Sequence, residues 1–188
     1  MKQIVIFASG SGTNAENLIG YFQDRSGASV VQVLTNNPHA KVIERCNRLK
    51  VSCLAFNRSA FFQTDDILDL LKFKNPDLIV LAGFLWMVPE KILKAFPGKI
   101  INIHPALLPN YGGKGMYGMY VHDAVIANKE TESGISIHHV NERYDEGVII
   151  FQAKCTIDPS DSAEDLAAKI HQLEMEHFPR VVESLLND

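Results

Sequence analysis

The sequence has 188 residues, of which 46% are hydrophobic and 21% charged, and its formal net charge is −4. This length predicts one domain over residues 1–188, with enough chain to bury a core. The acidic balance argues against binding to nucleic acid, because no basic stripe is available to displace counterions from phosphates. The basic clusters Lys91/Lys94 and Arg45/Arg48/Lys50 have helix-surface spacing, so solvated helix faces are expected there.

The cysteines and the apolar runs bear on compartment. The chain has three cysteines, Cys46, Cys53 and Cys155, and no C-x-x-C. A disulfide framework or a structural zinc site is therefore not expected, and no metal is predicted; buried structural thiols in a reducing, cytoplasmic setting fit better. The expected first strand begins at Gln3, which leaves no signal peptide. No apolar run approaches the roughly 18 residues of a membrane span, so no membrane partner is expected.

In the first half, short apolar runs alternate with helical patterns. The expected strands are Gln3–Ala8, Ser29–Thr35, Ser52–Phe56, Asp77–Leu81 and Lys99–Asn102. The expected helices are Asn14–Asp24, Ala40–Leu49, Ala60–Lys74 and Pro89–Ala95. The strands are rich in Val, Ile and Leu without polar alternation, as in strands buried on both faces. This rhythm predicts an α/β fold, a mostly parallel twisted sheet with helices on both faces.

After Pro109 the pattern changes. A Gly-rich loop precedes a short helix, two strands and a long helix, expected at 111–118, Val121–Asn128, Gly134–Val140, Val148–Thr156 and from Ser162 onward. We expect an antiparallel strand and a long C-terminal helix here, with Pro179 kinking or restarting that helix.

The first strand leads into Ser9-Gly10-Ser11-Gly12-Thr13-Asn14-Ala15-Glu16. Thr13 and Glu16 have the spacing of a capping box, so a helix should start there. Glycines before a helix let backbone N–H groups converge on an anion, and Asn14 can add a side-chain donor.

Three interpretations compete for this turn. A P-loop is excluded, because no Gly-Lys-Ser/Thr follows. The relaxed dinucleotide fingerprint Gly10-x-Gly12-x-x-Ala15 fits, but no carboxylate follows the second strand at Leu34–Pro38 to hold a ribose. A phosphate monoester is therefore favoured over a dinucleotide, with a ligand-free glycine turn as the remaining alternative.

Two further segments should meet the phosphate turn at the same edge of the sheet. Asn102-Ile103-His104-Pro105 ends a buried strand, and Asp145 follows later; an amide, an imidazole and a carboxylate can shuttle a proton and stabilise an oxyanion. A simple turn before proline is the alternative. The apolar segment Ala82–Pro89 can hold a flat heterocycle, although core packing explains its individual side chains equally well.

Together these residues resemble the folate-dependent formyltransferases, from Ile4 to about Phe178. The resemblance rests on Ser9–Asn14, Leu81-Ala82-Gly83-Phe84, Asn102-Ile103-His104-Pro105-Ala106-Leu107-Leu108-Pro109, Gly134-Ile135-Ser136-Ile137-His138 and Tyr144-Asp145-Glu146-Gly147. It implies a Rossmann-like formyltransferase fold. It also implies transfer of the formyl group of 10-formyltetrahydrofolate, a cosubstrate, to an amine. The phosphate turn narrows the acceptor to glycinamide ribonucleotide, a substrate of purine biosynthesis.

The resemblance also implies residue roles. Asn102, His104 and Asp145 would be catalytic, with the Asn102 amide and a protonated His104 donating to the oxyanion and Asp145 favouring the charged imidazole. Gly12, Thr13 and Asn14 would hold the phosphate, and Glu174 the ribose hydroxyls. The folate would be held, largely through backbone groups, by Phe84, Leu85, Trp86, Met87, Val88, Val140, Asn141 and Tyr144, with Arg58 at its glutamate tail. His138 is either a supporting residue or a core histidine.

Some features depart from the family pattern or leave alternatives. Trp86 stands where well-known members carry a basic residue, and the loop after Pro109 is long and rich in Gly, Met and Tyr. A 10-formyltetrahydrofolate hydrolase shares the trio but usually has an N-terminal regulatory domain. A methionyl-tRNA formyltransferase would need an RNA-binding domain, and a sugar-amine formyltransferase would bind a nucleotide-sugar. A non-catalytic nucleotide-binding module is the alternative of another class. The enzyme is expected to be a monomer or homodimer.

Overall fold

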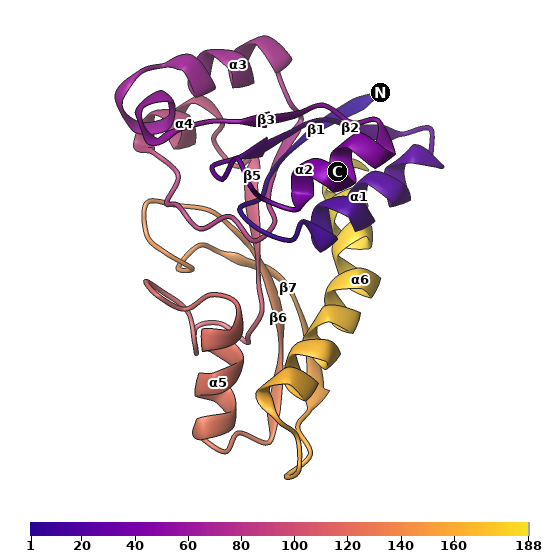
Figure 1. The fold of residues 1–188 in the computed structure, drawn as a ribbon, viewed down its shortest axis with the longest axis vertical. Coiled ribbons are helices and arrows are strands. Elements are labelled where there is room, and N and C mark those ends of the chain that lie inside the picture. Colours follow the sequence, from indigo (N-terminus) through magenta and orange to yellow (C-terminus); the bar gives the residue numbers. More distant parts are fainter. Residues whose placement is uncertain (188) are drawn as a thin grey trace.

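The computed structural model describes residues 1–187, which form a seven-stranded sheet with helices on both faces (Figure 1). The strands are β1 Lys2–Phe7, β2 Ala28–Thr35, β3 Cys53–Ala55, β4 Leu78–Leu81, β5 Ile100–His104, β6 Glu132–His139 and β7 Ile149–Thr156. Their order across the sheet is β3-β2-β1-β4-β5-β6-β7. The strands from β1 to β5 pair in parallel, whereas β6 runs antiparallel to both β5 and β7. The predicted α/β class is confirmed, including its antiparallel C-terminal part.

The helices fall close to their predicted positions. They are α1 Thr13–Gln23, α2 Val42–Leu49, α3 Asp66–Lys74, α4 Glu90–Ala95, α5 Met119–Ala127 and α6 Ala163–Asn187, with a π-helical turn, η1, at Ser59–Gln63. The single helix expected over Ala60–Lys74 is wrong, because Thr64 is extended between η1 and α3. The Thr64 hydroxyl donates to the carboxylate of Asp66 at 2.6 Å, a local bond that competes with helix continuation.

Pro179 does not restart the last helix, which runs unbroken from Ala163 to Asn187. Ser162 and Asp165 exchange bonds at its start, 2.9 Å from the Ser162 amide to the carboxylate and 3.1 Å from the Asp165 amide to the hydroxyl. This is a capping box. None of the helices within residues 1–187 is long and apolar enough to cross a membrane.

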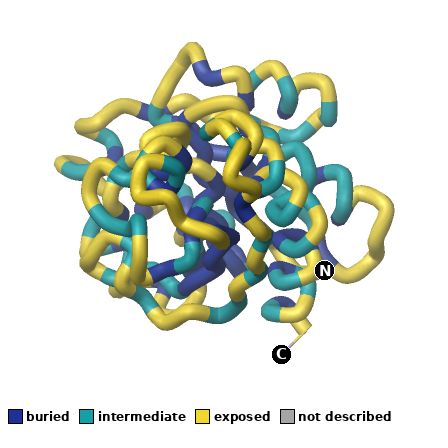
Figure 2. The backbone as a smooth tube through the Cα atoms, turned by 90° about the horizontal axis from the view of Figure 1, so that it is seen from below, coloured by how far each residue is buried: buried dark blue, intermediate teal, exposed yellow. Residues whose placement is uncertain are grey.

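The core consists of two clusters, one on each face of the sheet. Ile4 and Ile6 of β1 belong to the cluster that includes residues of α1, α5 and α6. Val5 and Phe7 belong to the other, which includes residues of α3 and α4. This division follows the two-residue period of a strand. Figure 2 shows buried backbone at the centre of the molecule, surrounded by exposed chain.

The strand order reverses beside β1. The chain moves outward from β1 to β2 and β3, then returns to place β4 on the other side of β1. At such a switch point the loops that follow the strands diverge and leave a crevice at the carboxyl ends. β1, β4 and β5 all end at this crevice, so the three segments singled out in the sequence meet there.

Candidate active site

The catalytic candidates sit on β5 and on the turn between β6 and β7. The strand extends through His104 rather than ending at Asn102, so the side chains of Asn102 and His104 lie on the same face. Asp145 has φ +55°, a left-handed conformation that Asp tolerates better than most residues. The loop between β6 and β7 brings Asp145 back to the side chains of β5.

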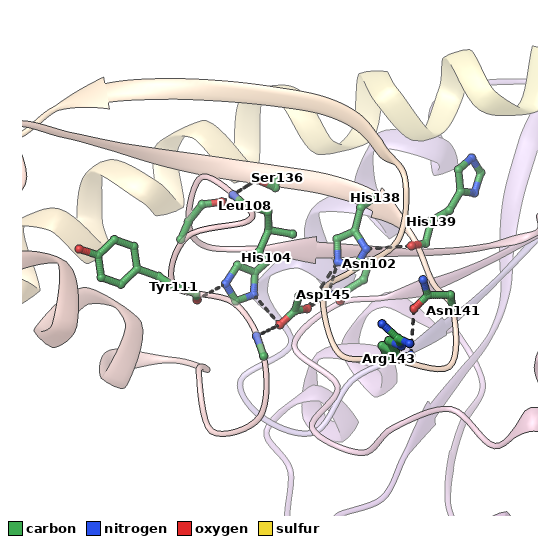
Figure 3. Close-up of polar contacts among 12 residues, drawn as sticks. Asn102, His104, Leu108, Tyr111, Ser136, His138, His139, Asn141, Arg143 and Asp145 are labelled. Atoms are coloured by element: carbon green, nitrogen blue, oxygen red, sulfur yellow. Dashed lines mark hydrogen bonds and ion pairs between the residues drawn. The ribbon is translucent and has the colours of Figure 1, made fainter.

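The three side chains lie close together, as Figure 3 shows. His104 Nδ1 is 3.6 Å from Asp145 Oδ2, and the Asn102 amide nitrogen donates to Asp145 Oδ1 at 3.4 Å. His104 is 3% exposed, and the Asp145 side chain is 11% exposed. The structure thus brings together the predicted amide, imidazole and carboxylate.

His138, on β6, supports Asn102. The register of β5 and β6 pairs these two residues, and Asn102 Nδ2 lies 3.1 Å from His138 Nε2. His138 Nδ1 is 2.9 Å from the carbonyl of His139. His138 Nε2 also lies 3.5 Å from Asp145 Oδ1, so this ring contacts both Asn102 and Asp145. Of the two roles considered for His138, the supporting one fits these contacts better than a core histidine.

Burial dominates the electrostatics of His104. It lowers the pKa of His104 below 6.5, and the Asp145 carboxylate and the Tyr111 carbonyl oppose this without cancelling it. Asp145 therefore favours the charged form of His104, whereas burial favours the neutral ring. Both ring nitrogens nevertheless face acceptors, since Nε2 lies 2.8 Å from the Tyr111 carbonyl. The imidazole can gain a second proton without leaving an N–H unpaired.

Asp145 remains a carboxylate. Burial raises its pKa, but His138, His104 and the Gly113 N–H together outweigh burial and hold the pKa below its usual value. The Gly113 amide donates to Oδ2 at 2.9 Å. Asp145 is therefore a fixed negative charge that can stabilise imidazolium when His104 accepts a proton.

One cavity of about 710 Å³ connects the trio to the predicted binding segments. It is lined by Gly12, Thr13, Asn14 and Glu174, by Asn102, His104 and Asp145, and by Phe84, Leu85, Trp86, Met87, Val88, Val140, Asn141 and Tyr144. Its size suits one or two small organic ligands. All the predicted site residues except Arg58 border it.

The glycine turn begins α1 in a different way from the expected capping box. Gly12 is the N-cap, with φ +74° and no side-chain cap, while the Glu16 carboxylate pairs with Arg45 and Arg48 of α2. Arg45 Nε also donates to the Ser11 carbonyl at 2.7 Å. Arg45 is thus not the solvated residue that its spacing predicted. These arginines neutralise Glu16, so the positive end of α1 remains available to an anion.

Asn14 and Glu174 join α1 to α6 at the cavity wall. The Asn14 amide nitrogen donates to Glu174 Oε2 at 2.9 Å, and the Asn14 Oδ1 is buried without a partner. One of the two side-chain N–H groups of Asn14 is therefore bonded to Glu174, and one is left for a ligand. Burial raises the pKa of Glu174, and the Asn14 amide and nearby His171 oppose that rise.

The apolar wall is a cluster of aromatic rings. Trp86 packs against Phe56, Phe61 and Phe62 with ring centroids 5.6–6.0 Å apart. Some backbone groups expected to bind ligand are already engaged, since the Leu85 amide donates to the Ser9 hydroxyl and the Val140 amide to the Ile100 carbonyl, both at 2.9 Å. Side-chain surface and the remaining backbone groups are left for a flat ring.

Arg58 does not line the cavity. Its guanidinium lies over the rings of Phe62 and Trp86, 4.6 and 5.7 Å from their centroids. These stacking contacts are favourable cation–π interactions, and they place a positive charge behind the aromatic wall.

The structure adds contacts that no residue pattern indicated. The Tyr111 carbonyl and the Gly113 amide contact His104 and Asp145 directly. His122 of α5 also borders the cavity, 6% exposed, and its Nδ1 has no partner. The Gly-rich loop was conspicuous in the sequence, but these contacts depend on its path through space. Within residues 1–187, no group of three or more His, Cys, Asp or Glu side chains is arranged to hold a metal ion.

This fold is that of a formyl transferase. The formyl transferase family model matches residues 2–182, and the chain belongs to that family. Phosphoribosylglycinamide formyltransferase of Bacillus subtilis (strain 168) is 36% identical over 193 residues, covering 99% of this chain and 95% of that protein. The chloroplastic phosphoribosylglycinamide formyltransferase of Arabidopsis thaliana is 34% identical, covering all of this chain and 66% of that protein. The crystal structure of glycinamide ribonucleotide transformylase 1 from Geobacillus kaustophilus matches with a TM-score of 0.89 at 35% identity, covering 99% of each chain.

Proposed function

We propose that this protein transfers the formyl group of 10-formyltetrahydrofolate to the amine of glycinamide ribonucleotide. The main support is that one cavity joins a glycine turn at a helix N-terminus, an amide–imidazole–carboxylate trio and an aromatic wall. The order of these three regions suits a phosphorylated amine at one end, a folate ring at the other and the formyl group between them. The names of the similar proteins support the same assignment.

The lining residues fit both substrates. The phosphate binds the amides of Gly12, Thr13 and Asn14, where the positive end of α1 favours an anion. Ribose hydroxyls donate to the Glu174 carboxylate, beside the buried, unpartnered Asn14 Oδ1. Apolar surface of the Phe84–Val88 wall covers one side of the folate ring.

The remaining folate interactions come from three further lining residues and from Arg58. Val140, Asn141 and Tyr144 also line the cavity. Arg58, behind Trp86, attracts the carboxylates of the folate glutamate tail.

The reaction begins when the amine attacks the formyl carbon. A carbon–nitrogen bond forms, the carbonyl electrons move onto oxygen, and the attacking nitrogen becomes positively charged. The Asn102 amide stabilises the oxyanion by donating to it. For this bond it gives up its 3.4 Å contact with Asp145, which is longer than its 3.1 Å contact with His138. Removal of one such donor typically costs about 10²–10³ in rate.

His104 then carries the proton. The neutral imidazole accepts a proton from the attacking nitrogen, directly or through water, and Asp145 stabilises the imidazolium that results. The imidazolium returns the proton to the leaving folate nitrogen as the carbon–nitrogen bond to folate breaks and the carbonyl reforms. The proton, the formyl group and the electrons are all accounted for without a covalent enzyme intermediate.

A deformylation assay tests the proposal. The protein is incubated with 10-formyltetrahydrofolate, with and without glycinamide ribonucleotide, and deformylated folate is followed over time. Turnover should depend on the ribonucleotide, and an Asp145→Asn variant purified in parallel reports contaminating activity. Equal rates with and without the ribonucleotide would identify a hydrolase. Formylation of a nucleotide-linked amino sugar, but not of the ribonucleotide, would identify a sugar-amine formyltransferase.

A further inference from the structure

The backbone of Tyr111 touches the catalytic histidine. Its carbonyl lies 2.8 Å from His104 Nε2, on the side of the ring away from Asp145 (Figure 3). Tyr111 reaches this position with φ +56°. A bulky residue rarely adopts this left-handed conformation, and the conformation persists only where the surroundings hold it.

Three contacts hold Tyr111 in place. Its ring packs against the core cluster that includes α5 and α6. The phenol donates to the Glu130 carboxylate at 2.7 Å and accepts from the Asn128 amide nitrogen at 2.9 Å. Asn128 caps the C-terminus of α5. Glu130 follows it in a turn, and the backbone amide of Glu130 donates to the Val125 carbonyl. The end of α5 is thus connected to His104 through Tyr111.

We propose that Tyr111 is a positioning residue for formyl transfer: anchored by Glu130 and Asn128, it uses its backbone carbonyl to select the His104 tautomer that carries its proton on Nε2. This inference rests on the function proposed above and assigns a purpose to the strained residue at the start of the Gly-rich loop. Tyr111 touches neither the formyl carbon nor the transferred proton in this scheme; it acts through His104.

The tautomer decides which ring nitrogen can exchange a proton. With Nε2–H bonded to the Tyr111 carbonyl, the lone pair is on Nδ1, the nitrogen 3.6 Å from Asp145. A proton gained at Nδ1 is therefore placed next to the carboxylate that stabilises it. Without the carbonyl, the buried Nε2–H would have no acceptor, and the opposite tautomer would gain population. In that opposite tautomer the neutral ring already carries its proton on Nδ1, so Nδ1 could not accept a proton from the substrate.

The same carbonyl affects the charge of His104. The charged or titratable side chains beside the ring are Asp145 from the β6–β7 turn and His138 from β6, which shift the pKa of His104, and His122 from α5, whose own pKa is lowered by His104. Asp145 and the Tyr111 carbonyl raise the pKa of His104, whereas burial and His138 lower it. Loosening the carbonyl contact therefore lowers the pKa further.

A Tyr111→Phe variant removes the phenol anchor and keeps the ring. Turnover should fall about 10- to 10²-fold, as expected when a catalytic group is misplaced by about 1 Å. The Michaelis constants of both substrates should change much less than turnover, because Tyr111 is not among the residues that line the cavity. The acid limb of the kcat/KM profile should move to lower pH. Tyr120→Phe is the matched control, since Tyr120 is 62% exposed and outside the cavity lining.

Nitrogen-15 NMR of labelled histidine reads the tautomer directly in the free protein. His104 should show protonated Nε2 and unprotonated Nδ1 in the wild type and in Tyr120→Phe, and mixed tautomers in Tyr111→Phe. A Glu130→Ala variant gives a second route, because it removes the carboxylate anchor at an exposed position. If both variants act through the same contact, the double variant should be no slower than the slower single variant.

Two kinds of failure are distinguishable. Absent formyl transfer in the wild type would refute the proposed function, while the NMR readout would still test the tautomer. An active wild type with unchanged His104 tautomer, turnover and pH profile in Tyr111→Phe would overturn the role of Tyr111. Additive losses in the Tyr111→Phe/Glu130→Ala double variant would also contradict action through a single anchored carbonyl.

Discussion

Replacement of Gly12 by alanine tests the proposed phosphate turn. The added methyl carbon would lie 2.4 Å from Val42 Cγ2 and 2.8 Å from Val42 Cα, at a residue with φ +74°. The left-handed backbone costs a non-glycine residue about 1–2 kcal/mol. Overpacking against α2 costs about 1–3 kcal/mol more. The turn cannot move freely, because the Val42 amide donates to the Gly10 carbonyl at 3.2 Å.

The total destabilisation of Gly12→Ala is therefore about 2–5 kcal/mol, a large part of the roughly 5–15 kcal/mol that stabilises a typical domain. For a chain of this length, the melting temperature should fall by about 4–20 °C. If the turn distorts to relieve this strain, the loss of stability should be smaller. The ribonucleotide KM should then rise, with the folate KM unchanged.

Thermal unfolding and steady-state kinetics measure the two effects in Gly12→Ala. Gly10→Ala is the matched control for unfolding, because it adds the same methyl in the same turn with no heavy atom within 4 Å and no positive φ. If Gly12→Ala melted like Gly10→Ala and kept the wild-type ribonucleotide KM, the described packing of this turn on α2 would be wrong.

Four other predictions follow from the site and its support. Asp145→Asn should lower kcat about 10²–10⁴-fold while changing the ribonucleotide KM little; near-normal turnover would remove Asp145 from proton transfer. Because burial lowers the pKa of His104 and the neutral ring acts as base, the acid limb of kcat/KM should fall below pH 6.5, and a limb above that value would contradict the assignment. The folded-state pKa of Glu174 is raised, so its stabilising contribution is complete at low pH and is lost as pH rises; Glu174→Gln should melt above the wild type at pH 8 but not at pH 4, and bind the ribonucleotide more weakly. Ser136→Ala should cost about 1–3 kcal/mol in a urea titration, because the Leu108 amide donates to this buried hydroxyl at 2.9 Å; an unchanged midpoint would indicate another acceptor.

Much of the fold was predictable because its signals are local. Val- and Ile-rich runs alternating with helical patterns are sufficient to indicate a parallel sheet buried on both faces. The failures concern individual side chains. Thr64 ends η1 through its bond to Asp66, and Glu16 pairs with arginines of α2 rather than capping α1. In each case a side chain took a partner that residue spacing does not specify.

The candidate site was also predictable only in part. The sequence by itself determined which chemical groups are available: a glycine turn before a helix, an amide and an imidazole two residues apart, and a later carboxylate. It did so because each group belongs to a short segment whose position follows from one strand or one turn. The outlying position of Arg58, stacked behind Trp86, was not predictable in this way.

Only the tertiary structure decided the state of those groups. The protonation of His104 depends on its burial, on the Asp145 carboxylate and on the carbonyl of Tyr111. Asp145 is distant in the chain, 43 positions from Asn102, and Tyr111 has a left-handed backbone conformation. Desolvation and hydrogen bonding are properties of a closed surrounding shell, and that shell exists only after β5, β6 and the Gly-rich loop have packed together.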